Sequence, residues 1–305
     1  MVLRTTFDTL SVIVPIAVVT FQFDPYAHLF GDLTVRWGTI ALAGVIVAAL
    51  VLAGLLARSG GLRPDDVALV AVGIVPGAVI GGRLGFLILH AGFYGAAPGR
   101  LLDPAIGGLE LGLAVVGGFL TGSYVASLLG APVGRWLHLA AAPLLLALAA
   151  GKLTMVLTGT GQGLPSAGDI ATAYLGPGPW GSLVPALPSQ PSQAFEGIAT
   201  FAILAVLALA LTFGAFRRRD GRLFFVAIGA WALARALVST TWRDPVVAGG
   251  LGAGGLIAVA IAIGSALALV ILTFRGRRVA MDTSDGRSTG ASEVVWPDPE
   301  TRPRF

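Results

Sequence analysis

Seven stretches of this chain are long and apolar enough to form membrane-spanning helices, and short polar segments separate them. A helix needs about 20 mostly apolar residues to cross the hydrocarbon core of a bilayer. The stretches cover residues 36–57, 67–90, 111–129, 136–157, 194–216, 223–242 and 250–274. The pattern predicts an all-α, polytopic membrane protein whose transmembrane domain of about seven helices occupies residues 35–275.

The two ends of the chain and one long loop do not fit the spanning pattern. The apolar run 10–23 is short and contains Pro15, and no A-x-A cleavage site precedes the next helix. We therefore expect residues 1–34 to form an interfacial or re-entrant segment rather than a cleaved signal peptide. The loop 158–193 has no basic residue, and the polar, aperiodic stretch 276–305 is expected to be a disordered tail.

The arginines give the chain an orientation. Ten of them flank the even-numbered loops and the end of the seventh span, whereas four lie on the opposite side. Positively charged residues concentrate on the cytoplasmic side of membrane proteins. The N-terminus is therefore expected outside and the C-terminus in the cytoplasm, with the loop 158–193 external.

Composition supports the membrane assignment and excludes several classes of function. Of 305 residues, 55% are hydrophobic and 12% charged, about half the charged content of a soluble domain. The net charge of +4 follows membrane topology and does not indicate a nucleic-acid partner. The chain has no cysteine, so disulfides, thiolate metal sites and a cysteine nucleophile are excluded. Its three histidines are not spaced as metal ligands, and no metal or cofactor is expected.

Three basic residues fall within the spans: Arg83, Arg235 and Lys152, the only lysine of the chain. A charged side chain facing lipid costs several kcal/mol, so such residues normally face the interior of the bundle. Together they suggest one internal site that attracts an anion. Lys152 and Arg235 lie near span ends, and snorkelling to the interface is the alternative for each of them.

A polar segment opens the fifth span with the sequence PSQPSQAFEG, residues 188–197. Two interpretations remain open. Ser192 acts as a helix N-cap and Glu196 benefits from the positive helix end, or Ser192, Gln193 and Glu196 form a polar rim directed into the site.

Several motifs, in order, resemble the bacterial prolipoprotein diacylglyceryl transferase family. They extend from about residue 23 to residue 275. The motifs read FDP (23–25), RWG (36–38), GGRLGFLILH (81–90), GLAVVGGFLTG (112–122), AAGKLTMVLTG (149–159), PSQAFEG (191–197) and GAWALARALVSTTWRDP (229–245).

The resemblance implies a specific reaction in the bacterial plasma (inner) membrane. Family members transfer the diacylglyceryl group of phosphatidylglycerol to the lipobox cysteine of a prolipoprotein signal peptide, and glycerol phosphate leaves. It implies catalytic roles for Arg235, Lys152 and Glu196. It implies substrate-binding roles for five residues: Arg83, Gly117, Gly118, Ser192 and Gln193.

The chain also departs from the family pattern. The signature of the fourth span keeps a lysine, Lys152, where the family has arginine, and Met155 and Thr158 stand where it has asparagines. Thr160 and Ser239 replace acidic residues. Either Glu196 or a neutral Lys152 is then the candidate general base. The alternative functions are a non-catalytic relative that binds anionic phospholipid or handles lipoproteins, and a transporter of small anions or lipids.

Overall fold

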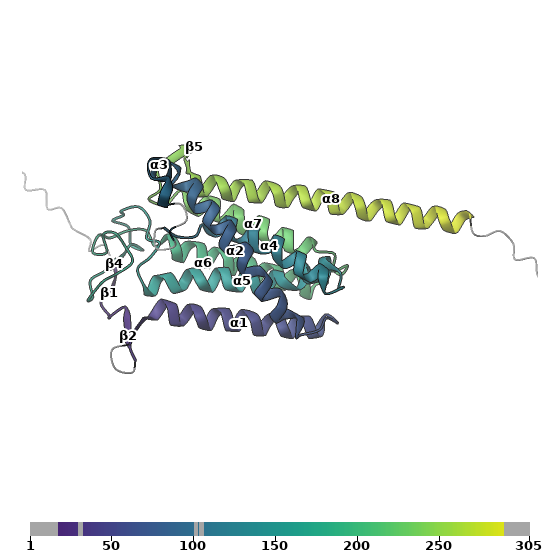
Figure 1. Cartoon of the computed structure of the whole chain (residues 1–305), viewed down its shortest axis with the longest axis horizontal. Helices are drawn as coiled ribbons and strands as arrows, with labels where there is room; N and C mark the ends of the chain where they lie inside the picture. Colours follow the sequence, from purple (N-terminus) through teal and green to yellow (C-terminus); the bar gives the residue numbers. More distant parts are fainter. Residues whose placement is uncertain (1–17, 30–32, 101–102, 104–106, 290–305) are drawn as a thin grey trace, which may run out of the picture.

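Seven long helices form a bundle in the computed structural model, which describes residues 18–29, 33–100, 103 and 107–289 (Figure 1). Each of the seven is long and apolar enough to cross a membrane. They are α1 (Trp37–Ser59), α2 (Asp66–Leu89), α4 (Leu111–Leu128), α5 (Val133–Thr154), α6 (Ser192–Thr212), α7 (Arg222–Ser239) and α8 (Ala253–Thr289). The predicted all-α membrane fold is confirmed. The largest boundary error is four residues, at the end of α6, which stops at 212 rather than at 216.

Helices α2 and α4 pack so closely that their backbones touch. A Cβ added to Gly77 would collide with the carbonyl oxygen of Gly117, and one added to Gly117 would collide with that of Gly77. Small residues at such crossings are typical of helix packing in membranes, where a close approach gains van der Waals contact.

A buried core joins α5, α7 and α8. It is centred on Trp231, which is fully buried, with Leu145 and Phe224 beside it. Many large apolar side chains instead lie on the outside, including Val72 at 71% and Leu237 at 74% exposure. Outward-facing apolar side chains of this size suit a lipid environment.

Short strands gather at the end of the bundle where α1 begins (Figure 1). Strand β1 (Val19–Phe21) pairs in parallel with β4 (Thr172–Tyr174), and β2 (Tyr26–His28) pairs with β3 (Thr34–Arg36). Strands β5 (Val246–Ala248) and β6 (Leu251–Gly252) form a hairpin between α7 and α8. Three short helical segments complete the fold: α3 (Ala91–Ala96), η1 (Pro98–Arg100) and η2 (Met155–Leu157).

Both ends of the chain differ in part from the sequence prediction. The last residues of the apolar run 10–23 form β1 and are tied to the loop 158–193, because their β-branched and aromatic side chains favour a strand; residues 1–17 lie outside the described part. At the other end α8 continues to Thr289, well into the stretch 276–305 that was expected to be disordered. A long apolar helix is already nucleated there, and each further residue then adds one hydrogen bond. Residues 290–305 lie outside the described part.

Candidate active site

Four charged side chains form a continuous chain of ion pairs inside the bundle. Lys152 Nζ lies 3.0 Å from Glu196 Oε2, and the other oxygen of Glu196 accepts from Arg235 at 2.7 Å. Arg235 also donates to Glu110 Oε1 at 3.0 Å. Both carboxylates are almost fully buried, at 1% and 2% side-chain exposure. Alternating charges of this kind allow two cations to be held away from water, where an isolated one would be costly.

The local structure of two helices explains where the carboxylates sit. Glu110 is the N-cap of α4, and its carboxylate accepts from the backbone N–H groups of Gly112 and Leu113 at 2.7 and 2.6 Å. Glu196 belongs to a buried polar stripe on α6 with Ser192, Gln193 and Thr200. Positions spaced by three to four residues share one helix face, so this stripe turns inward.

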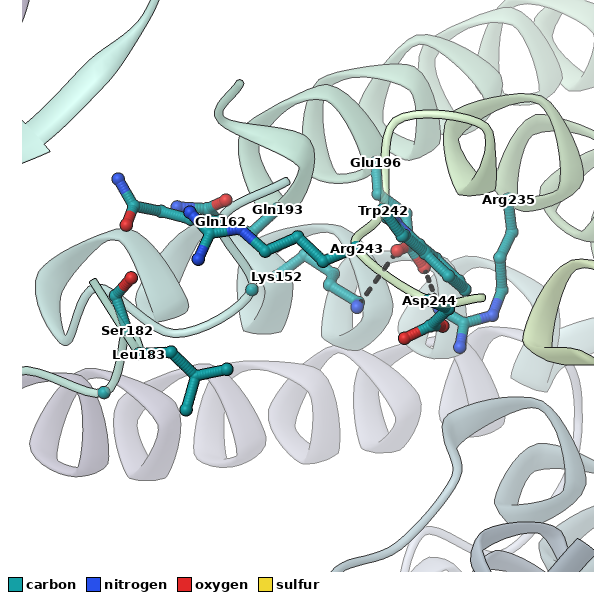
Figure 2. Close-up of a pocket in the computed structure, with 12 residues that line it drawn as sticks. Lys152, Gln162, Ser182, Leu183, Gln193, Glu196, Arg235, Trp242, Arg243 and Asp244 are labelled. Atoms are coloured by element: carbon teal, nitrogen blue, oxygen red, sulfur yellow. Dashed lines mark hydrogen bonds and ion pairs between the residues drawn. The ribbon is translucent and has the colours of Figure 1, made fainter. Parts of the chain in front are cut away.

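A cavity of about 330 Å³ opens beside the ion pairs (Figure 2). Glu196, Lys152 and Arg235 line it, and Figure 2 shows both cations directed at the Glu196 carboxylate. The other lining residues are Gly161, Gln162, Gly181, Ser182, Leu183, Gln193, Trp242, Arg243 and Asp244.

Trp242 covers the two cations. Its ring centroid lies 4.6 Å from the Arg235 guanidinium carbon and 5.9 Å from Lys152 Nζ. A cation over an indole face is attracted by the ring quadrupole. Trp242 therefore fixes the positions of both cations without consuming any of their hydrogen-bond donors.

Those spare donors are the chemically useful feature of the cavity. A guanidinium has five N–H bonds and an ammonium three. Among the described residues, Arg235 donates once to each of two carboxylates and its buried Nε has no partner. Lys152 contacts one carboxylate oxygen. The remaining N–H groups suit the oxygens of a phosphate.

The walls of the cavity come from two loops that are far apart in sequence. Arg243 donates from Nε to the Gly163 carbonyl at 2.6 Å and from a terminal nitrogen to Ser189 Oγ at 2.7 Å. Tyr174 donates to the Val156 carbonyl at 3.0 Å. Burial raises the pKa of Tyr174 to about 12, so the hydroxyl keeps its proton. The loop 158–193 is thereby held over the ends of α5 and α7.

Comparison with known proteins identifies the family. The sequence model of the prolipoprotein diacylglyceryl transferase family matches residues 25–271. The chain belongs to this family. It is 31% identical over 238 residues to the phosphatidylglycerol–prolipoprotein diacylglyceryl transferase of Geobacter sulfurreducens, covering 76% of this chain and 87% of that protein. It is 32% identical over 130 residues to the protein of the same name from Symbiobacterium thermophilum, covering 42% of this chain and about half (48%) of that protein.

The transferase family resemblance assigned Arg83 to the same site as Lys152 and Arg235, but the structure places it elsewhere. Arg83 donates to the Asp103 carbonyl at 3.0 Å and faces the Phe86 and Tyr94 rings at 6.0 and 5.7 Å. It does not line the cavity of Figure 2. The single site expected from three cations therefore reduces to two. Position along α2 could not reveal this, because the partners of Arg83 come from the loop that follows.

The glycine pair Gly117 and Gly118, expected to bind substrate, is used for helix packing. A Cβ on Gly118 would lie 2.9 Å from Ile74 of α2, and Gly117 touches the backbone of the same helix. Neither glycine lines the cavity.

The PSQ segment combines parts of both interpretations. Pro191, not Ser192, is the N-cap of α6. Ser192 Oγ instead contacts Thr241 Oγ1 at 2.6 Å, which anchors the loop after α7. Gln193 and Glu196 point into the cavity, as the polar-rim interpretation expected.

Four residues of the site were not singled out from the sequence. Glu110 was noted only as an acid at a helix entry, and Gln162, Trp242 and Arg243 were not considered as lining residues. Trp242 and Arg243 follow the Arg235 helix within the family motif 229–245, and that position was the available signal. Among the described residues, no three His, Asp or Glu side chains gather as metal ligands.

The family positions at which this chain differs are filled by packing. Ser239 donates to its own helix, and a Cβ on Gly255 of α8 would collide with its hydroxyl. Thr158 and Thr160 hydrogen-bond each other at 2.8 Å beneath the loop that carries Gly181. These sites leave no room for larger acidic side chains as the helices now stand.

Proposed function

We propose that the protein transfers the diacylglyceryl group of phosphatidylglycerol to the cysteine thiol of a prolipoprotein signal peptide. The observation that carries this proposal is the pair of cations, Lys152 and Arg235, held by Glu196 at the cavity. Membership of the family and the printed names of the relatives support the same reaction. No nucleic acid takes part.

In this reaction the thiol sulfur attacks the lipid glycerol carbon that bears the phosphate oxygen. A C–S thioether bond forms and the C–O bond breaks, so its electron pair leaves on the phosphate of glycerol phosphate. Negative charge on that phosphate grows in the transition state. Donors already fixed in place lower the barrier most, because they need no reorganisation. Lys152 and Arg235 fill this role, since Glu196 and Trp242 hold them before the lipid arrives.

The thiol proton passes to Glu196. Lys152 is ion-paired, which favours its charged form, so it is a donor rather than a base. Glu196 is the buried carboxylate of the cavity wall, and movement of Lys152 or Arg235 toward the phosphate frees one of its oxygens. Proton transfer and phosphate binding are thereby coupled.

The site lies in the bacterial inner membrane, at its outer face. Arginines concentrate at the opposite end of the bundle, in the loops after α1, α4 and α6, and this favours a cytoplasmic location for that end. The cavity then opens to the side where a signal peptide emerges after translocation.

The test is reconstitution of the purified protein with phosphatidylglycerol and a lipobox peptide, followed by mass spectrometry of the peptide. The expected product gains one diacylglyceryl group by thioether linkage, and a peptide with serine in place of cysteine gains none. Phosphatidylcholine in place of phosphatidylglycerol is the lipid control. Lipid binding without product, using a lipoprotein substrate from the same cell, would establish a non-catalytic relative instead.

A further inference from the structure

A second cavity lies at the arginine-rich end of the bundle, away from the transfer site. Its volume is about 520 Å³, and three different inter-helix loops contribute to its wall. The lining residues are Gly60, Pro132, Arg135, Arg217, Arg218 and Arg219. We propose that this cavity binds the phosphate of an anionic phospholipid headgroup in the adjacent leaflet. This inference does not rest on the proposed transfer reaction.

The arginines of this cavity lack carboxylate partners. Within the described part of the chain, none of Arg135, Arg217, Arg218 and Arg219 forms an ion pair. The nearest acid in sequence, Asp220, is paired with Arg222 at 3.1 Å. Four like charges repel one another, and a bound anion relieves that repulsion.

The loop after α6 is shaped to present its arginines together. Phe216 and Arg219 adopt left-handed backbone angles, with φ of 58° and 47°. Residues other than glycine rarely adopt this conformation, and where they do the surrounding contacts must impose it. Arg219 is one such contact, because it donates to the Gly60 carbonyl at 3.3 Å and so ties this loop to the loop after α1.

Membrane topology alone does not explain the arrangement. The rule that basic residues favour the cytoplasmic side requires charges in these loops but does not require them to converge. Arg58 and Arg63 lie in the same region, are exposed and do not line the cavity. Convergence of four guanidinium groups from two loops is the additional feature, and guanidinium groups grip phosphate oxygens in a bidentate manner.

The surroundings favour a lipid over a free phosphate. A Cβ on Gly214 would lie 2.6 Å from the Arg217 guanidinium, so this arginine lies over the end of α6. The preceding residue, Phe213, is 82% exposed. An acyl chain can therefore lie against apolar helix surface while its phosphate reaches the arginines.

The test is a lipid titration of the purified full-length protein, followed by native mass spectrometry. The variant R217Q/R218Q should bind phosphatidylglycerol at this site at least tenfold more weakly than the wild type, and high salt should weaken the wild type in the same direction. The matched control R63Q removes an arginine at the same end but outside the cavity, and should bind like the wild type. R135Q, on a different loop, should weaken binding as well and serves if the double variant does not fold.

The remaining arms separate the possible outcomes. Phosphatidylcholine should not compete, and glycerol phosphate and inorganic phosphate should compete only at much higher concentration. Equal phosphatidylglycerol affinity and stoichiometry for the wild type, R217Q/R218Q and R135Q would overturn the proposal. Binding of inorganic phosphate without binding of lipid would overturn its lipid source. Transfer activity of R217Q/R218Q should remain within about twofold of the wild type, so failure of this site and failure of the transfer function are distinguishable.

Discussion

Lys152 and Glu196 meet at 3.0 Å between Nζ and Oε2, across the interface between α5 and α6. The lysine lies in the last turn of α5 and the glutamate near the start of α6, so the pair joins the ends of two helices at the cavity. The glutamate is 1% exposed and the lysine 15%. The ammonium therefore does not snorkel to the interface: it is held inside the bundle by a buried carboxylate.

Loss of the lysine charge should abolish most of the transfer activity. We expect Lys152→Ala to lower kcat about 10²–10³-fold, the usual effect of removing one preorganised donor to a developing negative charge. Lys152→Arg should retain activity within about tenfold, because it keeps the charge and restores a bidentate donor. The measurement is the rate of thioether formation with a lipobox peptide. As a control, Arg100→Gln removes an exposed cation of the same end outside the cavity. Wild-type rates for Lys152→Ala would contradict the role given to this lysine.

Arg235 should be less tolerant of a conservative change than Lys152. It bridges Glu110 and Glu196 with two separate nitrogens, and a lysine has one nitrogen to offer. Arg235→Gln should lower the free energy of unfolding by about 3–5 kcal/mol, because two buried carboxylates lose their common partner. Arg235→Lys should fold but lose at least 100-fold in transfer rate. Thermal unfolding in detergent separates the two effects. Near-normal activity of Arg235→Lys would show that bridging is not required.

Much of the fold was predictable, because membrane helices announce themselves by length and hydropathy. Every span was placed, and the family order of motifs led to Lys152, Glu196 and Arg235, which the structure brings together at one cavity. Their grouping followed from the cost of burying charge: basic residues inside a bilayer must find partners.

The parts that were not predictable depend on long-range contacts. Arg83 carries the same charge and lies in a similar span, yet its partners come from the segment after α3 rather than from α5 and α7. Glu110 joins Arg235 across 125 positions, and Arg243 reaches Gly163 across 80. No periodicity along one helix encodes such pairs. The glycine pair was misassigned for the same reason, since only the neighbouring helix shows what touches Gly117.

Gln162 should contribute to recognition of the glycerol headgroup. Its Nε2 donates to the Thr172 carbonyl at 2.9 Å, which fixes the amide orientation, and among the described residues its buried Oε1 has no partner. An unpaired acceptor on the cavity wall suits a headgroup hydroxyl.

This role can be tested with a lipid analogue that lacks the headgroup hydroxyls. Gln162→Leu should raise KM for phosphatidylglycerol about tenfold, with little change in kcat. The wild type should bind the analogue about as weakly as the variant binds phosphatidylglycerol, and the variant should no longer distinguish the two lipids. A variant that still distinguishes them would exclude this contact.

Gly117 should prove to be a packing residue rather than a substrate contact. A Cβ at this position collides with the backbone of Gly77, which cannot move without separating α2 from α4. We expect Gly117→Ala to lower the free energy of unfolding by about 1–3 kcal/mol, the typical effect of overpacking. Gly44→Ala is the matched control, because a Cβ on that glycine of α1 meets nothing within 4 Å. It should be neutral or slightly stabilising, since alanine favours a helix over glycine. At temperatures where Gly117→Ala remains folded, its KM for phosphatidylglycerol should equal that of the wild type. A raised KM at unchanged stability would instead return Gly117 to the substrate site.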